Sequence, residues 1–274
     1  MPNKPKVAQP LYRSPLRLWL GCEYFIFKRR WQWFCSGTSW ARPQRQPETP
    51  HLVFHHHSPV LRPLQGVDMR LQENKRTNLA LALRHIDGTV IAPGQTFSVW
   101  RLVGRPTRRK GYLPGLVLAN GQIGSGTGGG LCQLGNLLFW LFAHSPLAIT
   151  ERYRHSYDVF PGVARSVPFG AGATLAYNYI DLQVRNLTPH HFRIRLWLDE
   201  TDLNGELLCD AEPAERYRVE ERDHRIVQQP WGGYTRHNRI VRVGEKSGEE
   251  TLLAVNHAVM MYAPLLSDGG ETAR

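Results

Sequence analysis

The sequence predicts an α+β fold in which one central, buried helix packs on an antiparallel β-sheet. Residues 131–144 are apolar on nearly every side, which is typical of a helix inside a core. Short runs of alternating apolar and polar residues follow this helix. They lie at residues 157–160, 174–179, 182–185 and 192–198. A period of two indicates strands with one buried face, and a chain of 274 residues can bury such a core without disulfides.

Composition divides the chain into three predicted parts. Residues 1–66 hold nine prolines and ten Lys or Arg against two Glu, so that this segment has a net charge of +8 out of +11 for the whole chain. We expect a basic extension there, residues 67–205 as the main domain, and residues 206–274 as a small C-terminal β appendage. The appendage prediction rests on two further alternating runs, at residues 239–243 and 251–261.

The extension contains one stretch with helical periodicity, residues 16–33, in which aromatic side chains alternate with Arg17, Lys28 and other basic residues. A basic, aromatic helix of this kind can lie in a membrane interface. It could equally pack on the surface of the domain, and the sequence leaves both interpretations open.

Neither the histidines nor the cysteines predict a metal site. A histidine cluster consists of His51, His55, His56 and His57. Because no Cys or acidic residue lies nearby at a ligand spacing, we expect a short polar loop there. The cysteines are scattered and form no CxxC pair: Cys22, Cys35, Cys132 and Cys209. This pattern argues against a zinc ribbon and a disulfide framework, and it favours a reducing compartment. We expect no cofactor.

The main domain should begin with a helix over residues 77–85, since Thr77-Asn78 can cap it and Asp87-Gly88 can end it. The alternating leucines would also fit a strand, but the capping residues and the alanines favour a helix. Residues 89–100 predict two strands around a Pro93-Gly94 turn. Residues 117–123 predict a hairpin around Asn120-Gly121.

A glycine-rich turn over residues 124–130 leads directly into the predicted buried helix. Glycine loses more backbone entropy on folding than any other residue, so three in a row, Gly128, Gly129 and Gly130, need a physical reason. One reason is close backbone approach. Another is a concavity of N–H groups that binds an anion or a developing oxyanion. The stretch lacks the ending of a phosphate-binding P-loop and the spacing of a dinucleotide fingerprint.

Cys132 should lie in the first turn of the buried helix, where the helix dipole lowers the pKa of a thiol. His155 is the candidate base, Asp181 or Asp158 could orient its imidazole, and Gln133 could donate to an oxyanion. Cysteine is also among the most buried residue types, so each of these residues could be structural. The spacing therefore leaves two hypotheses, a Cys132 nucleophile and a non-catalytic module whose turn grips an anionic ligand.

Several short motifs resemble the VanW family, over roughly residues 70–200. They are Asn78-Leu79, Gly88-Thr89-Val90, Pro93 to Ser98, Gly104, Lys110-Gly111-Tyr112, Gly128 to Leu134, Arg154-His155-Ser156, Asp181-Leu182 and Arg185-Asn186. The family takes its name from an accessory protein of B-type vancomycin resistance, which implies a link to the cell envelope. Combined with the Cys132 hypothesis, this link predicts a cysteine-dependent hydrolase or transferase that acts on an amide or peptide-like envelope substrate. Combined with the alternative hypothesis, it predicts a small or peptide-like envelope ligand that the module binds.

No apolar run is long enough to span a bilayer, and the N-terminal residues show no secretory signal. We therefore expect a cytoplasmic protein, with an anionic membrane surface as the candidate partner of residues 1–66. Nucleic acid is the least expected partner, because no recognition motif accompanies the charge.

Overall fold

The computed structural model describes residues 14–61, 68–119, 122–159 and 167–264. The chain divides into two compact units, Met1–Gly37 and Thr38–Arg274, and each is described by itself. The first unit holds helix α1 (Pro15–Cys35). The hydroxyl of Ser14 caps this helix by accepting from the N–H of Arg17 at 3.4 Å, and Pro15 suits the first helical position. No helix in the described part of the chain is long and apolar enough to cross a membrane.

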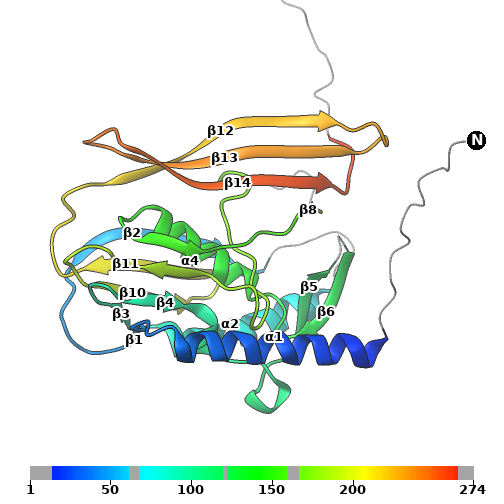
Figure 1. Ribbon diagram of the computed structural model, residues 1–274, viewed down its shortest axis with the longest axis horizontal. Coiled ribbons are helices and arrows are strands. Elements are labelled where there is room, and N and C mark those ends of the chain that lie inside the picture. The colour runs from blue at the N-terminus through cyan, green and yellow to red at the C-terminus, as the bar shows by residue number, and fades with distance from the viewer. Residues whose placement is uncertain (1–13, 62–67, 120–121, 160–166, 265–274) are drawn as a thin grey trace, which may run out of the picture. The chain divides into compact units, whose positions relative to one another are not determined.

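The second unit is built on a five-stranded antiparallel sheet, which confirms the α+β class (Figure 1). Its strands, in spatial order, are β1 (Arg42–Pro43), β3 (Thr89–Ile91), β10 (Phe192–Leu198), β11 (Asp202–Cys209) and β2 (His51–Pro59). Helix α4 (Cys132–Ala143) lies across this sheet and buries Leu134, Leu138 and Phe139 completely. Gly205 on β11 makes room for it, because a Cβ there would lie 3.0 Å from Leu137.

The histidine cluster forms strand β2, not the polar loop that the sequence predicts, and it pairs with β11. The ring of Phe54 stacks on that of His144 with 3.8 Å between centroids, and the ring of His56 lies 6.2 Å from that of Trp140 on α4. His56 is therefore a half-buried aromatic side chain, while His55 and His57 are exposed. The sequence predicts an N-terminal extension of residues 1–66, but the first compact unit ends at Gly37. Residues after it form β1 and β2, which belong to the five-stranded sheet.

The remaining elements surround α4. Helix α2 is Met69–Ile86, α3 is Val99–Val103, and η1 is a 3-10 turn at Arg108–Lys110. A second sheet contains β4 (Thr96–Ser98), β9 (Gln183–Arg185) and β7 (Ala148–Glu151), and a hairpin pairs β5 (Pro114–Ala119) with β6 (Gln122–Thr127). The hairpin is confirmed, while its Asn120-Gly121 turn lies outside the described residues.

Two sequence predictions in this region are wrong. Helix α2 begins eight residues before Thr77 and is capped by Asp68, whose carboxylate accepts from the N–H of Arg70 at 2.9 Å. Residues 174–179 form no strand. The chain turns back on itself there, so Ala176 and Ile180 make a single bridge with each other.

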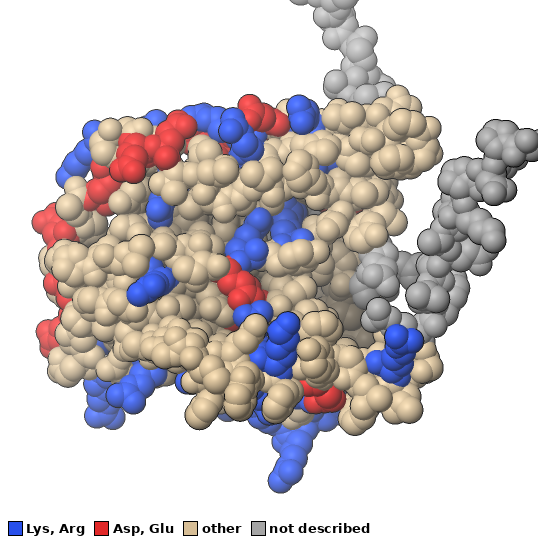
Figure 2. Space-filling view, viewed as in Figure 1, with Lys and Arg blue, Asp and Glu red and all other residues tan. Residues whose placement is uncertain are grey.

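The C-terminal sheet contains β12 (Tyr217–Gln228), β13 (Tyr234–Gly244), β14 (Glu250–Met260) and β8 (Tyr157–Asp158), which pairs in parallel with β14. Its outer strand β12 carries both signs of charge, as Figure 2 shows, and Arg218 and Arg222 pair with Glu220. The predicted boundary at residue 205 falls inside β11. Arg242 on β13 also ties this sheet to the rest of the unit by donating to the carbonyl of Leu147 at 3.1 Å.

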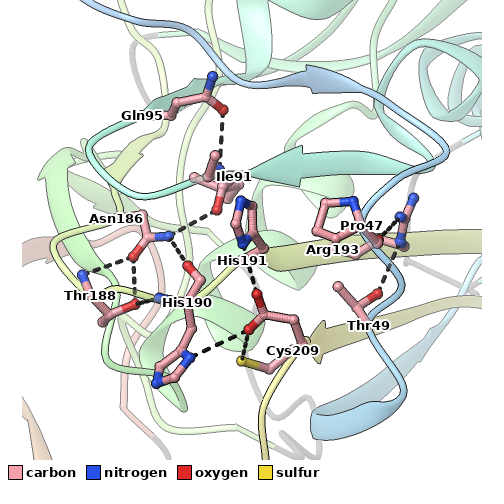
Figure 3. A network of polar contacts seen from close by, with 12 residues as sticks. Pro47, Thr49, Ile91, Gln95, Asn186, Thr188, His190, His191, Arg193 and Cys209 are labelled. Carbon is pink, nitrogen blue, oxygen red and sulfur yellow. Dashed lines mark hydrogen bonds and ion pairs between the residues drawn. The ribbon is translucent and has the colours of Figure 1, made fainter.

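Two polar side chains hold distant segments against the main sheet (Figure 3). Arg193 on β10 donates to the carbonyls of Arg45 and Pro47, at 2.9 and 2.6 Å, and to the hydroxyl of Thr49 at 3.0 Å. Asn186, which is fully buried, donates to the carbonyl of Ile91 at 2.8 Å. Each of these side chains thus satisfies main-chain carbonyls of segments that lie far away in the sequence.

The pH dependence of stability should report on the histidines of β2. Burial, and to a lesser extent the neighbouring charges of His57, His144 and His55, lower the pKa of His56 to about 4. The unfolded chain binds this proton more readily, so the free energy of unfolding should fall as the pH drops from 6.5 towards 4. His56→Gln should flatten this fall in urea denaturation, whereas exposed His85→Gln should not. Identical pH slopes for wild type and His56→Gln would contradict the burial of His56.

Candidate functional site

The glycine-rich stretch is half strand and half turn. Gly124 and Gly126 lie in β6, paired with β5, and only the three consecutive glycines form the turn that precedes α4. Gly128 and Gly130 have φ values of +77° and +91°, a region that side chains with a Cβ rarely adopt. The predicted turn is therefore confirmed for residues 128–130 and wrong for residues 124–127.

Close backbone approach accounts for these glycines. A Cβ on Gly129 would lie 2.1 Å from the carbonyl oxygen of Gly115 in β5, and a Cβ on Gly115 would lie 2.4 Å from the carbonyl oxygen of Gly129. A Cβ on Gly130 would lie 2.3 Å from the side chain of Lys75 in α2. The turn is thus pressed between β5 and α2, and no side chain fits at the contact.

One buried amide fixes this contact. Asn78 of α2 is fully buried, and its Nδ2 donates to the carbonyls of Gly129 and Leu113, at 2.9 and 3.0 Å. Its Oδ1 accepts from the N–H of Leu113 at 2.8 Å. A single side chain therefore joins α2, the start of β5 and the glycine turn, and all of its hydrogen-bonding atoms are used.

Cys132 is the first residue of α4, as predicted, but its thiol is not activated. The sulfur donates to the carbonyl of Leu175 at 3.8 Å. Burial raises the pKa of this thiol, and the hydrogen bonds that stabilise the thiolate do not offset that effect. The expected lowering of the pKa is therefore wrong. The field of a helix N-terminus shifts a pKa less than burial of the whole sulfur does.

Gln133 and Asp181 have structural partners. The Nε2 of Gln133 donates to the hydroxyl of Ser58 and to the carbonyl of Pro59, both at 2.9 Å, and so joins α4 to the end of β2. The buried carboxylate of Asp181 accepts from the hydroxyl of Ser98 at 2.5 Å and from the N–H of Trp100 at 3.2 Å, where α3 begins. Burial raises the pKa of Asp181 to about 6, against the opposing effect of these hydrogen bonds.

The three predicted catalytic residues do not form a hydrogen-bonded triad in the described structure. His155 uses its main-chain N–H to donate to the hydroxyl of Thr174 at 2.9 Å, next to the residue that accepts from Cys132. Neither its imidazole and the thiol nor its imidazole and Asp181 are joined by a hydrogen bond. Among the described residues, no three His, Cys, Asp or Glu side chains are grouped to hold a metal ion.

His155 instead lies in the wall of a cavity of about 300 Å³ between the segment that follows β7 and strand β14. Arg152, Arg154, His155 and His257 supply the cationic and titratable side chains of its lining, and Phe169 supplies an aromatic ring. None of the described residues that line it is acidic. The cavity is therefore a cationic and aromatic site.

Hydrogen bonds fix the arginines of this cavity. Arg152 donates to the carbonyl of Gly172 at 2.8 Å and to the side-chain oxygen of Asn256 at 3.1 Å. Burial lowers its pKa to about 10, so it stays charged near neutral pH. Arg154 lies over the ring of Phe169, with 4.1 Å from its guanidinium carbon to the ring centroid. Such stacking orients the planar guanidinium.

A pair of histidines fixes the ring of His257, which lines the opposite side of the cavity. His237 and His257 face each other across β13 and β14, with 2.6 Å between their Nδ1 atoms, so one ring donates a proton to the other. The Nε2 of His237 lies 2.8 Å from the hydroxyl of Thr235. Sequence reasoning missed His257, because only the strand register brings it to His237 and to the cavity.

The packing of the glycine turn predicts a position-specific effect on stability. Gly129→Ala should lower the free energy of unfolding by about 2 kcal/mol or more, because its methyl group meets the backbone of β5 and the neighbours cannot relax freely. Gly124→Ala is the matched control, since a Cβ there meets only the side chain of Val117, at 3.8 Å. Equal stability of the two variants in chemical denaturation would contradict the close approach.

The environment of Cys132 predicts slow alkylation. In a variant with Cys22, Cys35 and Cys209 replaced by Ser, Cys132 should react with iodoacetamide more slowly than exposed Cys22 does in the reciprocal variant. The pH midpoint of the reaction should also be higher for Cys132, because burial raises its pKa. A midpoint below that of Cys22 would instead support an activated nucleophile.

Comparison with known proteins places these features in a family. The sequence model described as VanW like protein matches residues 74–208, which include Asn78, the glycine turn and His155 but not His257. The Vancomycin B-type resistance protein VanW of Enterococcus faecalis (strain ATCC 700802 / V583) is 36% identical over 199 residues, 73% of this chain and 72% of that protein. The Uncharacterized protein YoaR of Bacillus subtilis (strain 168) is 33% identical over 117 residues, 42% of this chain and 36% of that protein. No solved structure matches the chain. This chain belongs to the VanW-like family.

Proposed function

We propose that this protein is a binding module for an anionic, peptide-like ligand of the cell envelope, held in the cavity between Arg154, His155 and His257. The observation that carries the proposal is the composition of that cavity, which gathers two arginines and two histidines around about 300 Å³ with no acidic residue among the described lining. A cavity of this size holds a small ligand.

The side chains that line the cavity favour a ligand that carries a carboxylate. A guanidinium presents its N–H groups in a planar fork that matches two carboxylate oxygens. Arg152 is held by the main chain and Asn256 and belongs to the wall. Arg154, whose guanidinium lies over Phe169 in the cavity lining, is the cation that we assign to the ligand. Phe169 and Val255 add apolar surface, which fits a ligand that carries short apolar groups beside its charge.

The histidines should make binding depend on pH. Burial, and then the charge of Arg154, lower the pKa of His155, so its imidazole is neutral near pH 7 in the free protein. A bound anion stabilises the protonated ring and raises this pKa again, so affinity should increase as the pH falls from about 8 to about 6.

The proposed ligand class takes its biological setting from the family. A relative that shares 36% identity with the chain is named for vancomycin resistance, and a link to the cell envelope follows from that name only as part of this proposal. The hypothesis of a Cys132-dependent hydrolase or transferase has less support. Its thiol donates to Leu175 and has a raised pKa, and Cys132 is not among the residues that line the cavity.

Calorimetric titration with a short acetylated alanine peptide tests the proposal. The peptide with a free C-terminal carboxylate should bind, and its C-terminal amide should bind at least tenfold more weakly, because a charge-assisted hydrogen bond is lost. Arg154→Gln should weaken binding of the acid by about tenfold or more. Arg84→Gln, an exposed control on α2, should leave it unchanged.

Two results would contradict the proposal. One is equal affinity for the acid and the amide, and the other is unchanged affinity in Arg154→Gln. Cys132→Ala separates the two hypotheses when cleavage of the peptide is followed beside its affinity. A cysteine-dependent hydrolase or transferase would lose turnover in this variant, whereas a binding module should show no turnover with or without the thiol and should keep its affinity. Thermal unfolding of each variant establishes that it is folded before its affinity is compared.

A further inference from the structure

Helix α1 exposes a stripe of large apolar side chains. At the helical period, Leu16, Leu20, Phe27, Trp31 and Phe34 fall on one face. Their exposed fractions are 66, 53, 66, 58 and 82%, respectively, far above those of core residues. The rings of Phe27 and Trp31 stack with 6.5 Å between centroids, and those of Trp31 and Phe34 lie 6.1 Å apart, so the aromatic surface is continuous. A contiguous exposed patch of this kind marks a docking surface.

Basic side chains border the stripe on both sides. Helical spacing places Arg17 and Lys28 along one edge of the face, and Arg30 together with the acidic Glu23 along the other. Within α1, four Lys or Arg stand against the single acidic residue Glu23, a net charge of +3. A partner for this face must offer an apolar interior and negative charge beside the edge that carries Arg17 and Lys28.

We propose that α1 docks flat on an anionic lipid surface, with its apolar stripe at the boundary between headgroups and acyl chains. Trp and Tyr side chains prefer this boundary, and Trp31 and Tyr24 are exposed by 58 and 60%. Arg17 and Lys28 extend from the edge of the stripe to the headgroups while their stems stay in apolar surroundings. The helix is not apolar enough to span a membrane, so it lies in the plane.

Charge favours a lipid surface over a second copy of the chain as the partner of this stripe. Two α1 helices that met through this stripe would bring together two helices that each carry a net charge of +3. The surface of an anionic bilayer is negative, so each basic side chain near it raises the affinity by about fivefold.

Vesicle flotation with the full chain tests the docking. Wild type should float with vesicles that contain about a third phosphatidylglycerol, and weakly with pure phosphatidylcholine. Phe27→Ser with Trp31→Ser should reduce flotation at least tenfold, because the apolar contact is lost. Trp231→Ser is the matched control, since Trp231 is exposed by 68% outside α1, and it should float like wild type.

A second pair of substitutions tests the contribution of charge to membrane binding. Arg17→Gln with Lys28→Gln should weaken binding to the anionic vesicles by about tenfold or more and leave the weak binding to neutral vesicles unchanged. Absence of wild-type flotation, or equal flotation of the Phe27/Trp31 variant and wild type, would overturn the proposal. So would a dimer in sedimentation velocity that disappears in that variant without any vesicle binding, because the stripe would then be a self-association surface.

Discussion

The backbone contact between Gly115 and Gly129 is the constraint on which the rest of the main unit depends. It brings the β5–β6 hairpin against the turn that starts α4, and the carbonyl of Gly129 is held there by Asn78 of α2. The position of α4 then follows from this fixed start. Gln133, in the first turn of the helix, reaches the end of β2. Gly205 of β11 leaves space for the helix on the sheet, because it has no side chain.

Polar residues within the family motifs complete this architecture. Asn78 and Asn186 donate to main-chain carbonyls of other segments, and Asp181 organises the start of α3. Each is fully buried, so an unmet partner would cost about 1–3 kcal/mol. The ligand site that we propose lies elsewhere, in the cavity between the segment around Arg154 and strand β14. The residues that build the fold are thus distinct from the residues that line the proposed site.

Sequence periodicity predicted the parts of the fold whose pattern is local. The apolar run of α4, the alternation of β10 and the β5–β6 hairpin each occupy one continuous segment, and the structure has all three. Strand β2 was missed because its histidines count as polar, although they pack as aromatic rings.

The candidate site was less predictable, because it depends on what the fold places over each residue. Spacing identified Cys132 and His155 but could not show that burial would outweigh the helix dipole at the sulfur. His257 gave no signal in the sequence, because it lies about a hundred residues from His155 and meets the cavity only through the register of β14. Close backbone approach was one of two explanations that the sequence left open for the glycine turn, and the sequence could not name the partner strand.

A double-mutant cycle on Gly115→Ala and Gly129→Ala tests the central constraint most directly. Each methyl group would push apart the same two backbone segments. Once one substitution has separated them, the second should cost little, so the double variant should lose at least about 1 kcal/mol less stability than the sum of the single losses. Additive losses in denaturant unfolding would show that the two glycines do not share one contact, and would contradict the account.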